Sequence, residues 1–152
     1  LPLLDDLFNR LAHDRLGFAR RHLPFFPSIV QLGDLSMKHI WLIYQNDQLA
    51  GYAIASLSGS ILSVNDLLLE KGIRLAFGIS ALGEAARAKY VEIRLNHSSD
   101  LPDLTEHEFQ VTNPAWGTFM IKPLTADLSM AEARGLLGVD SDRFLLSWLD
   151  VT

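Results

Sequence analysis

The chain has 152 residues, of which 49% are hydrophobic, and it carries a formal net charge of -5 and no cysteine. This length and apolar content predict one domain with its own hydrophobic core. The negative charge argues against a nucleic-acid partner, and the lack of cysteine excludes disulfides, thiolate metal ligands and cysteine nucleophiles. No apolar run approaches the about 20 residues of a membrane-spanning helix, so we expect a cytoplasmic protein with no membrane partner.

The N-terminal part of the chain predicts either one long helix or two helices divided at Gly17, followed by an irregular segment. Apolar residues at helical spacing favour an amphipathic helix over residues 2–22, with Asp5 and Asp6 in its first turn, where the helix dipole stabilises anions. Residues 23–30 (LPFFPSIV) contain two prolines. Because proline interrupts regular structure, we expect this segment to be irregular and to expose its aromatic side chains.

A β-hairpin is predicted next. Residues 39–45 and 49–57 are rich in apolar and β-branched side chains, and Asn46 and Asp47 between them favour a short hairpin turn. A third strand over residues 61–69 follows, and its polar pair Asn65-Asp66 indicates a bulge or a sheet edge, or else groups that face a substrate groove.

The central unit of the chain, residues 60–96, is predicted to be strand–helix–strand. The helix follows from a stripe at helical spacing, formed by Leu75, Ile79, Leu82 and Ala86, and the second strand covers residues 90–95. A crossover of this kind places its two strands parallel. A ligand of such a unit usually lies where the first strand leads into the helix N-terminus.

The remaining elements complete a predicted α/β (α+β) fold. We expect a short helix over residues 101–107, strands over 109–112, 116–122 and 144–149, and a helix after Ser129 with Glu132 in a capping box and Gly138 as its C-terminal cap. The sheet should be mixed and mostly antiparallel, with six or seven strands and helices on both faces.

The sequence nominates no metal site and no catalytic residue. The five histidines are scattered, and we find no carboxylate beside them at ligand spacing, so no metal is expected. Glu106 and Glu108 flank His107 on a short helix and should therefore point apart, which makes a poor acid–base pair. Trp41, Trp116 and Trp148 are more typical of core or interface anchors than of a base-stacking platform.

This order of elements resembles the GNAT (GCN5-related N-acetyltransferase) superfamily without its first strand. LFNRLAHDRLGFARR resembles the opening helices, and IWLIYQNDQLAGYAIASLSG resembles the hairpin. SILSVNDLLLE and IRLAFGISALGEAARAKYVEIRLN resemble the strand, helix and strand of the acyl-CoA site. The chain is most similar to the degenerate second (C-terminal) domain of tandem proteins of this superfamily.

The resemblance also implies a domain organisation. Residues 1–152 should form a single GNAT-like domain, with residues 123–152 as a C-terminal helix–strand extension. Because the sequence begins at Leu1 rather than Met, we expect it to be a fragment of a longer chain. A preceding GNAT domain or a second copy in a homodimer is the partner that this organisation suggests.

The cofactor implied by the resemblance is acetyl-CoA, whose pyrophosphate would bind backbone amides at the helix N-terminus. The cofactor-binding residues would be Leu69, Gly72, Ile73, Arg74, Gly78 and Ser80. The family motif is Gln or Arg, two residues, Gly, one residue, then Gly or Ala. Counted from Arg74, both glycine positions are lost to Phe77 and Ile79; counted one residue later, Gly78 and Ser80 fit but Leu75 replaces the arginine.

Two functions stay open at this level. In the first, the chain is an acyl-CoA-dependent N-acetyltransferase-like domain with a degenerate cofactor site, in which the Phe77 ring either covers the amide donors or fills the groove of the pantetheine. The tyrosine that often protonates the leaving thiolate in the family is replaced by Leu104. In the second, the chain is a non-catalytic structural or interaction domain that completes a tandem or dimeric acetyltransferase.

Overall fold

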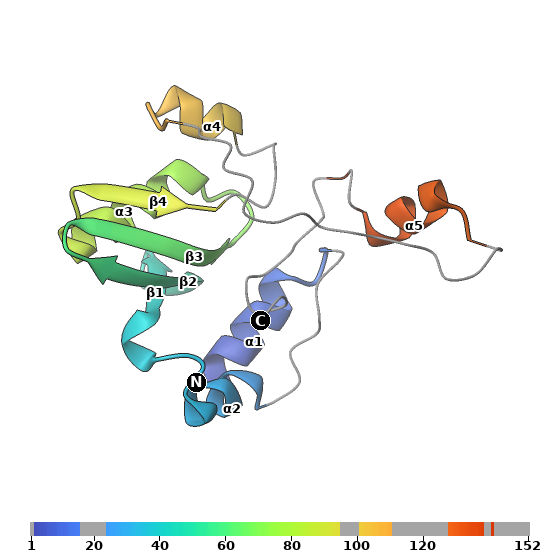
Figure 1. Cartoon of the computed structure of the whole chain (residues 1–152), viewed down its shortest axis with the longest axis horizontal. Helices are drawn as coiled ribbons and strands as arrows, with labels where there is room; N and C mark the ends of the chain where they lie inside the picture. Colours follow the sequence, from blue (N-terminus) through green and yellow to red (C-terminus); the bar gives the residue numbers. More distant parts are fainter. Residues whose placement is uncertain (1, 16–23, 95–100, 111–127, 139–140, 142–152) are drawn as a thin grey trace.

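The computed structural model of the chain describes residues 2–15, 24–94, 101–110, 128–138 and 141 (Figure 1). In chain order the elements are α1 (Pro2–Leu11), α2 (Phe25–Leu32), the 3₁₀ turn η1 (Met37–His39), β1 (Ile40–Gln45), β2 (Gln48–Ser58), β3 (Ile61–Leu69), α3 (Leu75–Ala86), β4 (Tyr90–Ile93), α4 (Leu101–Glu106) and α5 (Met130–Leu137). Within the described ranges, every helix is too short or too polar to cross a membrane.

The described strands form one mixed sheet in the order β1-β2-β3-β4. β1, β2 and β3 pair antiparallel, and β4 pairs parallel to β3, as the strand–helix–strand pattern predicts. The described part of the sheet has four strands rather than the expected six or seven. Two of the expected strands, residues 116–122 and 144–149, lie outside the described residues, and Phe109 and Gln110 of a third belong to no strand.

The hairpin turn is the predicted one. Asn46 and Asp47 have φ angles of 50° and 62°, so both central residues adopt the left-handed conformation. That pair of conformations is typical of a type I′ turn, whose twist matches the twist of the flanking strands. Asparagine and aspartate tolerate it better than other non-glycine residues, which explains why the sequence pattern located the turn correctly.

A β-bulge in β3 confirms the structural interpretation of the Asn65-Asp66 pair. Ile54 of β2 pairs with Asp66, and the next residue, Ala55, pairs with Val64, so that Asn65 is the extra residue of β3. Because side chains alternate along a strand, one extra residue reverses which side chains face each side of the sheet. Leu62 and Val64 before the bulge therefore belong to one core, and Leu68 after it belongs to the other, although all three have even numbers.

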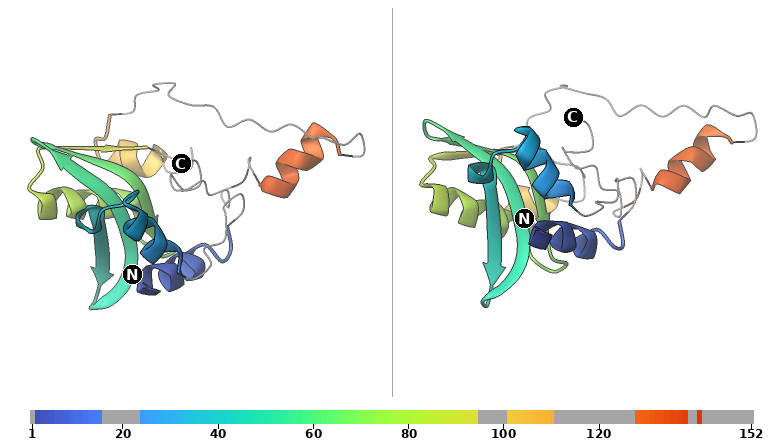
Figure 2. Two further views of the ribbon diagram at one scale, coloured as in Figure 1. Left: turned by 60° about the horizontal axis from the view of Figure 1, so that its bottom comes forward. Right: turned by 90° about the horizontal axis from the view of Figure 1, so that it is seen from below.

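Helices cover both faces of the sheet, as expected (Figure 2). On one face α1 and α2 pack on β2 and on the end of β3, and the buried residues of this α1–α2 core are Leu4, Leu7, Phe8, Ala12, Phe26, Leu35, Tyr52, Ile54 and Leu68. On the other face α3 packs on the start of β3, and the buried residues of this α3 core are Ala53, Ala55, Leu62, Val64 and Leu82.

The prediction that residues 23–30 are irregular and expose their aromatic rings is wrong. These residues lead into α2, in which Pro27 lies in the first turn, where a missing N–H costs no helical hydrogen bond. Phe26 is fully buried and its ring meets the Tyr52 ring edge-on, with a centroid distance of 5.7 Å. The aromatic side chains are therefore core residues, and they no longer argue for an interaction surface.

Asp5 has a different role from the expected one. Its side chain is fully buried, and its Oδ1 accepts a hydrogen bond from the backbone N–H of Phe26 at 3.1 Å. Pro24, the residue before α2, offers no side-chain cap. Asp5 thus supplies from α1 the N-terminal cap that α2 lacks locally. The predicted helix over residues 2–22 ends at Leu11, and residues 16–23 lie outside the described part.

The helix boundaries of α3 and α5 follow from local signals. α3 ends at Ala86 and is capped by Arg87, which has a left-handed φ of 53°, and its apolar stripe buries Ile79 and Leu82 as predicted. In α5, Ser129 and Glu132 form both hydrogen bonds of a capping box, and Gly138 is a left-handed C-terminal cap with φ 65°. Both predicted caps of α5 are confirmed.

The buried stripe of α3 yields a stability prediction. Leu82 is 4% exposed in the α3 core, so Leu82→Ala should lower the free energy of unfolding by about 2–5 kcal/mol, through lost burial and the cavity left behind. Lys89→Ala, at an exposed side chain, should change it by less than about 0.5 kcal/mol. Urea denaturation followed by circular dichroism measures both, and equal midpoint shifts would contradict this packing.

Candidate functional site

The candidate site is the first turn of α3, which follows the carboxyl end of β3. Between the two elements, Gly72 takes a left-handed φ of 95°, a conformation that a side chain would strain. Arg74 is the N-terminal cap residue, and its own side chain makes no capping hydrogen bond. The first backbone N–H groups of a helix have no acceptor inside the helix, so this turn needs acceptors from elsewhere.

Asp103 of α4 provides those acceptors. One of its carboxylate oxygens, Oδ2, accepts from the Ala76 backbone N–H at 2.9 Å, and the other, Oδ1, accepts from Arg74 Nε at 2.8 Å. Arg74 also donates through Nη2 to the Glu106 carboxylate at 2.8 Å. The helix N-terminus therefore binds an oxyanion in this structure, and that oxyanion is a side chain of the same chain.

The electrostatics of this contact favour the charged form of Asp103. The pKa of Asp103 lies below its ordinary value, mainly because the Ala76 N–H donates to the carboxylate, with a further contribution from Arg74. Its side chain is only 21% exposed, which limits screening by water and salt. The hydrogen bond to Asp103 in turn raises the pKa of Arg74. The two carboxylates and one guanidinium leave one net negative charge here.

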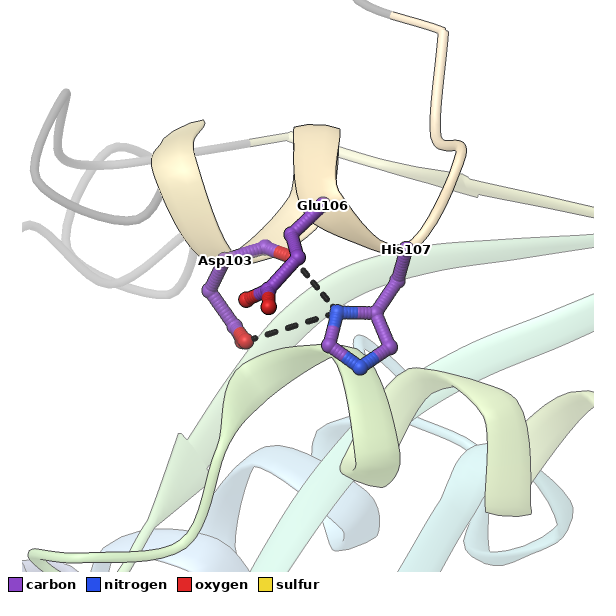
Figure 3. Close-up of side chains that lie close together, drawn as sticks. All are labelled: Asp103, Glu106 and His107. Atoms are coloured by element: carbon purple, nitrogen blue, oxygen red, sulfur yellow. Dashed lines mark hydrogen bonds and ion pairs between the residues drawn. The ribbon is translucent and has the colours of Figure 1, made fainter.

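His107 follows α4 and lies beside Asp103 (Figure 3). Its Nδ1 lies 2.8 Å from the Asp103 backbone carbonyl oxygen and 3.7 Å from the Asp103 carboxylate. Because a carbonyl oxygen can only accept, Nδ1 is the donor in the contact with the Asp103 carbonyl oxygen. The imidazole meets the Phe77 ring edge-on, with 5.5 Å between the centroids.

Phe77 does not cover the amide donors as the sequence predicted. Its side chain is 56% exposed, and its ring lies against His107 and under the Arg74 guanidinium, whose Cζ is 5.3 Å from the ring centroid. The group that covers the Ala76 amide is the Asp103 carboxylate. Phe77 instead contributes an aromatic contact between α3 and the end of α4.

An apolar contact holds α4 independently of these charges. Leu104 is 2% exposed and packs with Ala76 and Ile79 of α3, while Leu67 and Ile93 of the two parallel strands pack around the same cluster. The pairing of β3 with β4 ends at Val64 and Ile93, just before the bulge. Leu104 therefore fills space beside the last part of β3, where the described residues of β4 no longer pair with it.

The six predicted cofactor-binding residues lie at the end of β3, in the turn that follows it and in the first two turns of α3. Arg74 alone among them contacts Asp103 through its side chain. Gly78 is buried, and a Cβ there would lie 2.8 Å from Cδ1 of Leu69, so both residues serve the packing of α3 on β3. Gly72 forms the turn, Ile73 is half-buried beside it, and Ser80 is exposed one turn further along α3.

Asp103 was not predicted from the sequence, and Glu106 and His107 were considered only as part of a poor acid–base pair. The expectation that no carboxylate lies at ligand spacing from a histidine is wrong, because Asp103 and His107 are four residues apart and their side chains meet. The spacing of three and four residues was visible in the sequence. The sequence did not show that these side chains would contact the first turn of α3.

The same three side chains could in principle hold a cation. One ligand atom from each of Asp103, Glu106 and His107 lies within 4.8 Å of the others. Arg74, however, already donates to the carboxylates of Asp103 and Glu106. The cation that these carboxylates bind in the structure is therefore the guanidinium, and the arrangement gives no support for a metal ion.

A scan against protein-family models finds no match for this sequence, and a search of curated proteins finds none either. Among solved structures, the chain is similar to one described as a "probable acetyltransferase", with 15% identity over 82% of this chain and 91% of that chain, and a TM-score of 0.45. A second, described as "Putative acetyl transferase from Pyrococcus furiosus", has 13% identity over 81% and 93% of the two chains, and a TM-score of 0.45.

The observed contacts do not fit acetyl-CoA in the present arrangement. A pyrophosphate needs backbone N–H groups and a cation at the first turn of the helix. Here the Ala76 N–H and the Arg74 guanidinium both donate to carboxylates of α4. A cofactor could use these donors only if α4 released them.

The contact between α3 and α4 should weaken in acid. Because the pKa of Asp103 is lowered on folding, its stabilising contribution is present above the ordinary value of 3.8 and is lost as the pH falls through the lower folded value. The other charged or titratable groups that face it are Arg74, Glu106 and His107.

The Ala76 amide proton, followed by NMR from about pH 6 downward, should therefore shift with a midpoint below the usual aspartate range. Asp103→Asn should abolish this transition, while Glu132→Gln, at the remote capping box of α5, should leave it unchanged. A midpoint at or above 3.8 would contradict the assigned contact.

Proposed function

We propose that the chain is a GNAT-like domain of the acyl-CoA-dependent N-acetyltransferase type whose cofactor site is degenerate. The observation that supports this proposal most directly is the oxyanion bound at the first turn of α3. The Ala76 N–H and the Arg74 guanidinium both donate to one carboxylate there, at 2.9 and 2.8 Å. These are the donor types that a cofactor phosphate requires, at the carboxyl end of a parallel strand.

The architecture supports the same proposal. An antiparallel meander leads into two parallel strands joined by a helix, in the order that the sequence resemblance implies. Pairing between the parallel strands stops at the bulge at Asn65. Beyond Val64, β3 continues for five residues without a described partner on its β4 side, next to the helix turn that binds the carboxylate.

The chemistry of acetyl transfer is supported less well than cofactor binding. Transfer from a thioester to an amine needs a group that accepts the amine proton and a group that protonates the leaving thiolate. The resemblance would place a tyrosine at position 104, but Leu104 is buried in the apolar contact of α4. The His107 ring is held by the Asp103 carbonyl oxygen and by Phe77.

An acetyl-CoA titration of the unmodified chain tests this proposal. Since the turn donors are engaged, we expect a dissociation constant of about 1 mM or weaker, a binding free energy of only about -4 kcal/mol. Isothermal calorimetry or NMR shifts of the α3 amides would measure it, with desulfo-CoA and adenosine as controls for the acyl and phosphate groups.

Two other results would change the assignment. Micromolar binding would show that the cofactor site is intact and that the chain binds acyl-CoA as an active member of the family would. If acetyl-CoA still does not bind once the Asp103 carboxylate has been removed from the first turn of α3, the alternative is favoured. In that alternative the chain is a non-catalytic domain that completes a tandem or dimeric acetyltransferase.

A further inference from the structure

The contact between Asp103 and α3 imitates the contact of a bound phosphate. One oxygen takes a backbone N–H of the helix turn and the other takes the guanidinium, at 2.9 and 2.8 Å. A phosphate group at this turn would need the same two donors. Occupation of the turn by α4 and occupation by a phosphate are therefore mutually exclusive.

We propose that α4 is an autoinhibitory element that closes the α3 turn with its own carboxylate. We call these hydrogen bonds the latch contact: Asp103 accepts from Arg74 and from the Ala76 N–H, and Glu106 accepts from Arg74. The latch contact must open before an anionic cofactor can bind. This inference rests on the proposed acyl-CoA function for the identity of the ligand. It goes beyond that function because it explains the weak acetyl-CoA binding by a reversible contact, and not by the loss of the groups that would bind the cofactor.

The latch contact has the properties of a reversible closure. Arg74 and Glu106 are 44% and 71% exposed in their side chains, so the ion pair between them is screened by water and salt. Asp103 is better shielded and makes the contact to the helix turn itself. A ligand that carries more than one negative charge can replace this single carboxylate on both donors.

Opening the latch need not unfold α4. Leu104 anchors α4 in a separate apolar cluster with Ala76 and Ile79, and this cluster does not involve the charged side chains. Removal of the Asp103 carboxylate should consequently uncover the Ala76 amide while Leu104 keeps α4 near α3. The two parts of the contact can thus be separated by mutation.

The test compares the unmodified chain with Asp103→Ala and with a matched control, Glu84→Ala. Glu84 is an exposed carboxylate on α3, near the end of the helix opposite to the latch contact. Acetyl-CoA and inorganic pyrophosphate are titrated into each protein while the Ala76 amide is followed by NMR, and thermal unfolding verifies that each variant is folded.

We expect Asp103→Ala to bind acetyl-CoA about tenfold more tightly than the unmodified chain, within the range of typical coupling between two competing contacts. The Ala76 amide should lose its protection from hydrogen exchange in this variant, and Glu84→Ala should behave like the unmodified chain. If Asp103→Ala does not fold, Asp103→Asn serves instead. It keeps an acceptor for the Ala76 N–H but removes the charge, so it should give a smaller gain in the same direction.

The outcomes separate this inference from the proposed function. Acetyl-CoA binding of equal strength in Asp103→Ala and the unmodified chain would overturn the latch and leave the proposed function in place. Pyrophosphate binding that appears only in Asp103→Ala, without acetyl-CoA binding, would support the latch and overturn the proposed ligand. A variant with an uncovered Ala76 amide that binds neither compound would overturn both.

Discussion

The extra residue in β3 is the constraint on which the rest of the structure depends. Because Asn65 has no partner in β2, the alternation of side chains reverses along β3. Leu62 and Val64 consequently face α3, while Leu68 faces α1 and α2. One strand thus contributes to two cores on opposite faces of the sheet. Among the described residues its pairing with β4 also stops at this point, and α4 packs beside the end of β3.

Two kinds of contact hold α4 against α3. The Leu104 cluster is apolar and buried, so it contains no group that titrates or binds an anion. The latch contact consists of charged, partly exposed groups, so it responds to pH, to screening by salt and to an anionic ligand. A helix held by both can stay attached while the charged contact exchanges its partner. That division makes competition between a side chain and a cofactor physically reasonable at this turn.

Local patterns in the sequence predicted most of the described elements. The Asn46-Asp47 turn, the parallel crossover, the apolar stripe of α3 and both caps of α5 depend on neighbouring residues, and all of them are confirmed. The failures involve contacts between distant segments. Phe25–Leu32 form a helix because Asp5, on another helix, caps it and because the Phe26 ring has a partner in Tyr52. Likewise, Asp103 could be recognised as the cap of α3 only once α4 had been placed next to it.

In the ligand-free protein, we expect the end of α4 to lie on the first turn of α3. The most direct measurement is a nuclear Overhauser effect between the ring protons of Phe77 and those of His107, whose ring centroids are 5.5 Å apart in this structure. We predict a clear cross-peak in the ligand-free protein near neutral pH. Complete absence of that cross-peak, in a folded protein with both rings assigned, would contradict the account, because α4 would then not close the turn.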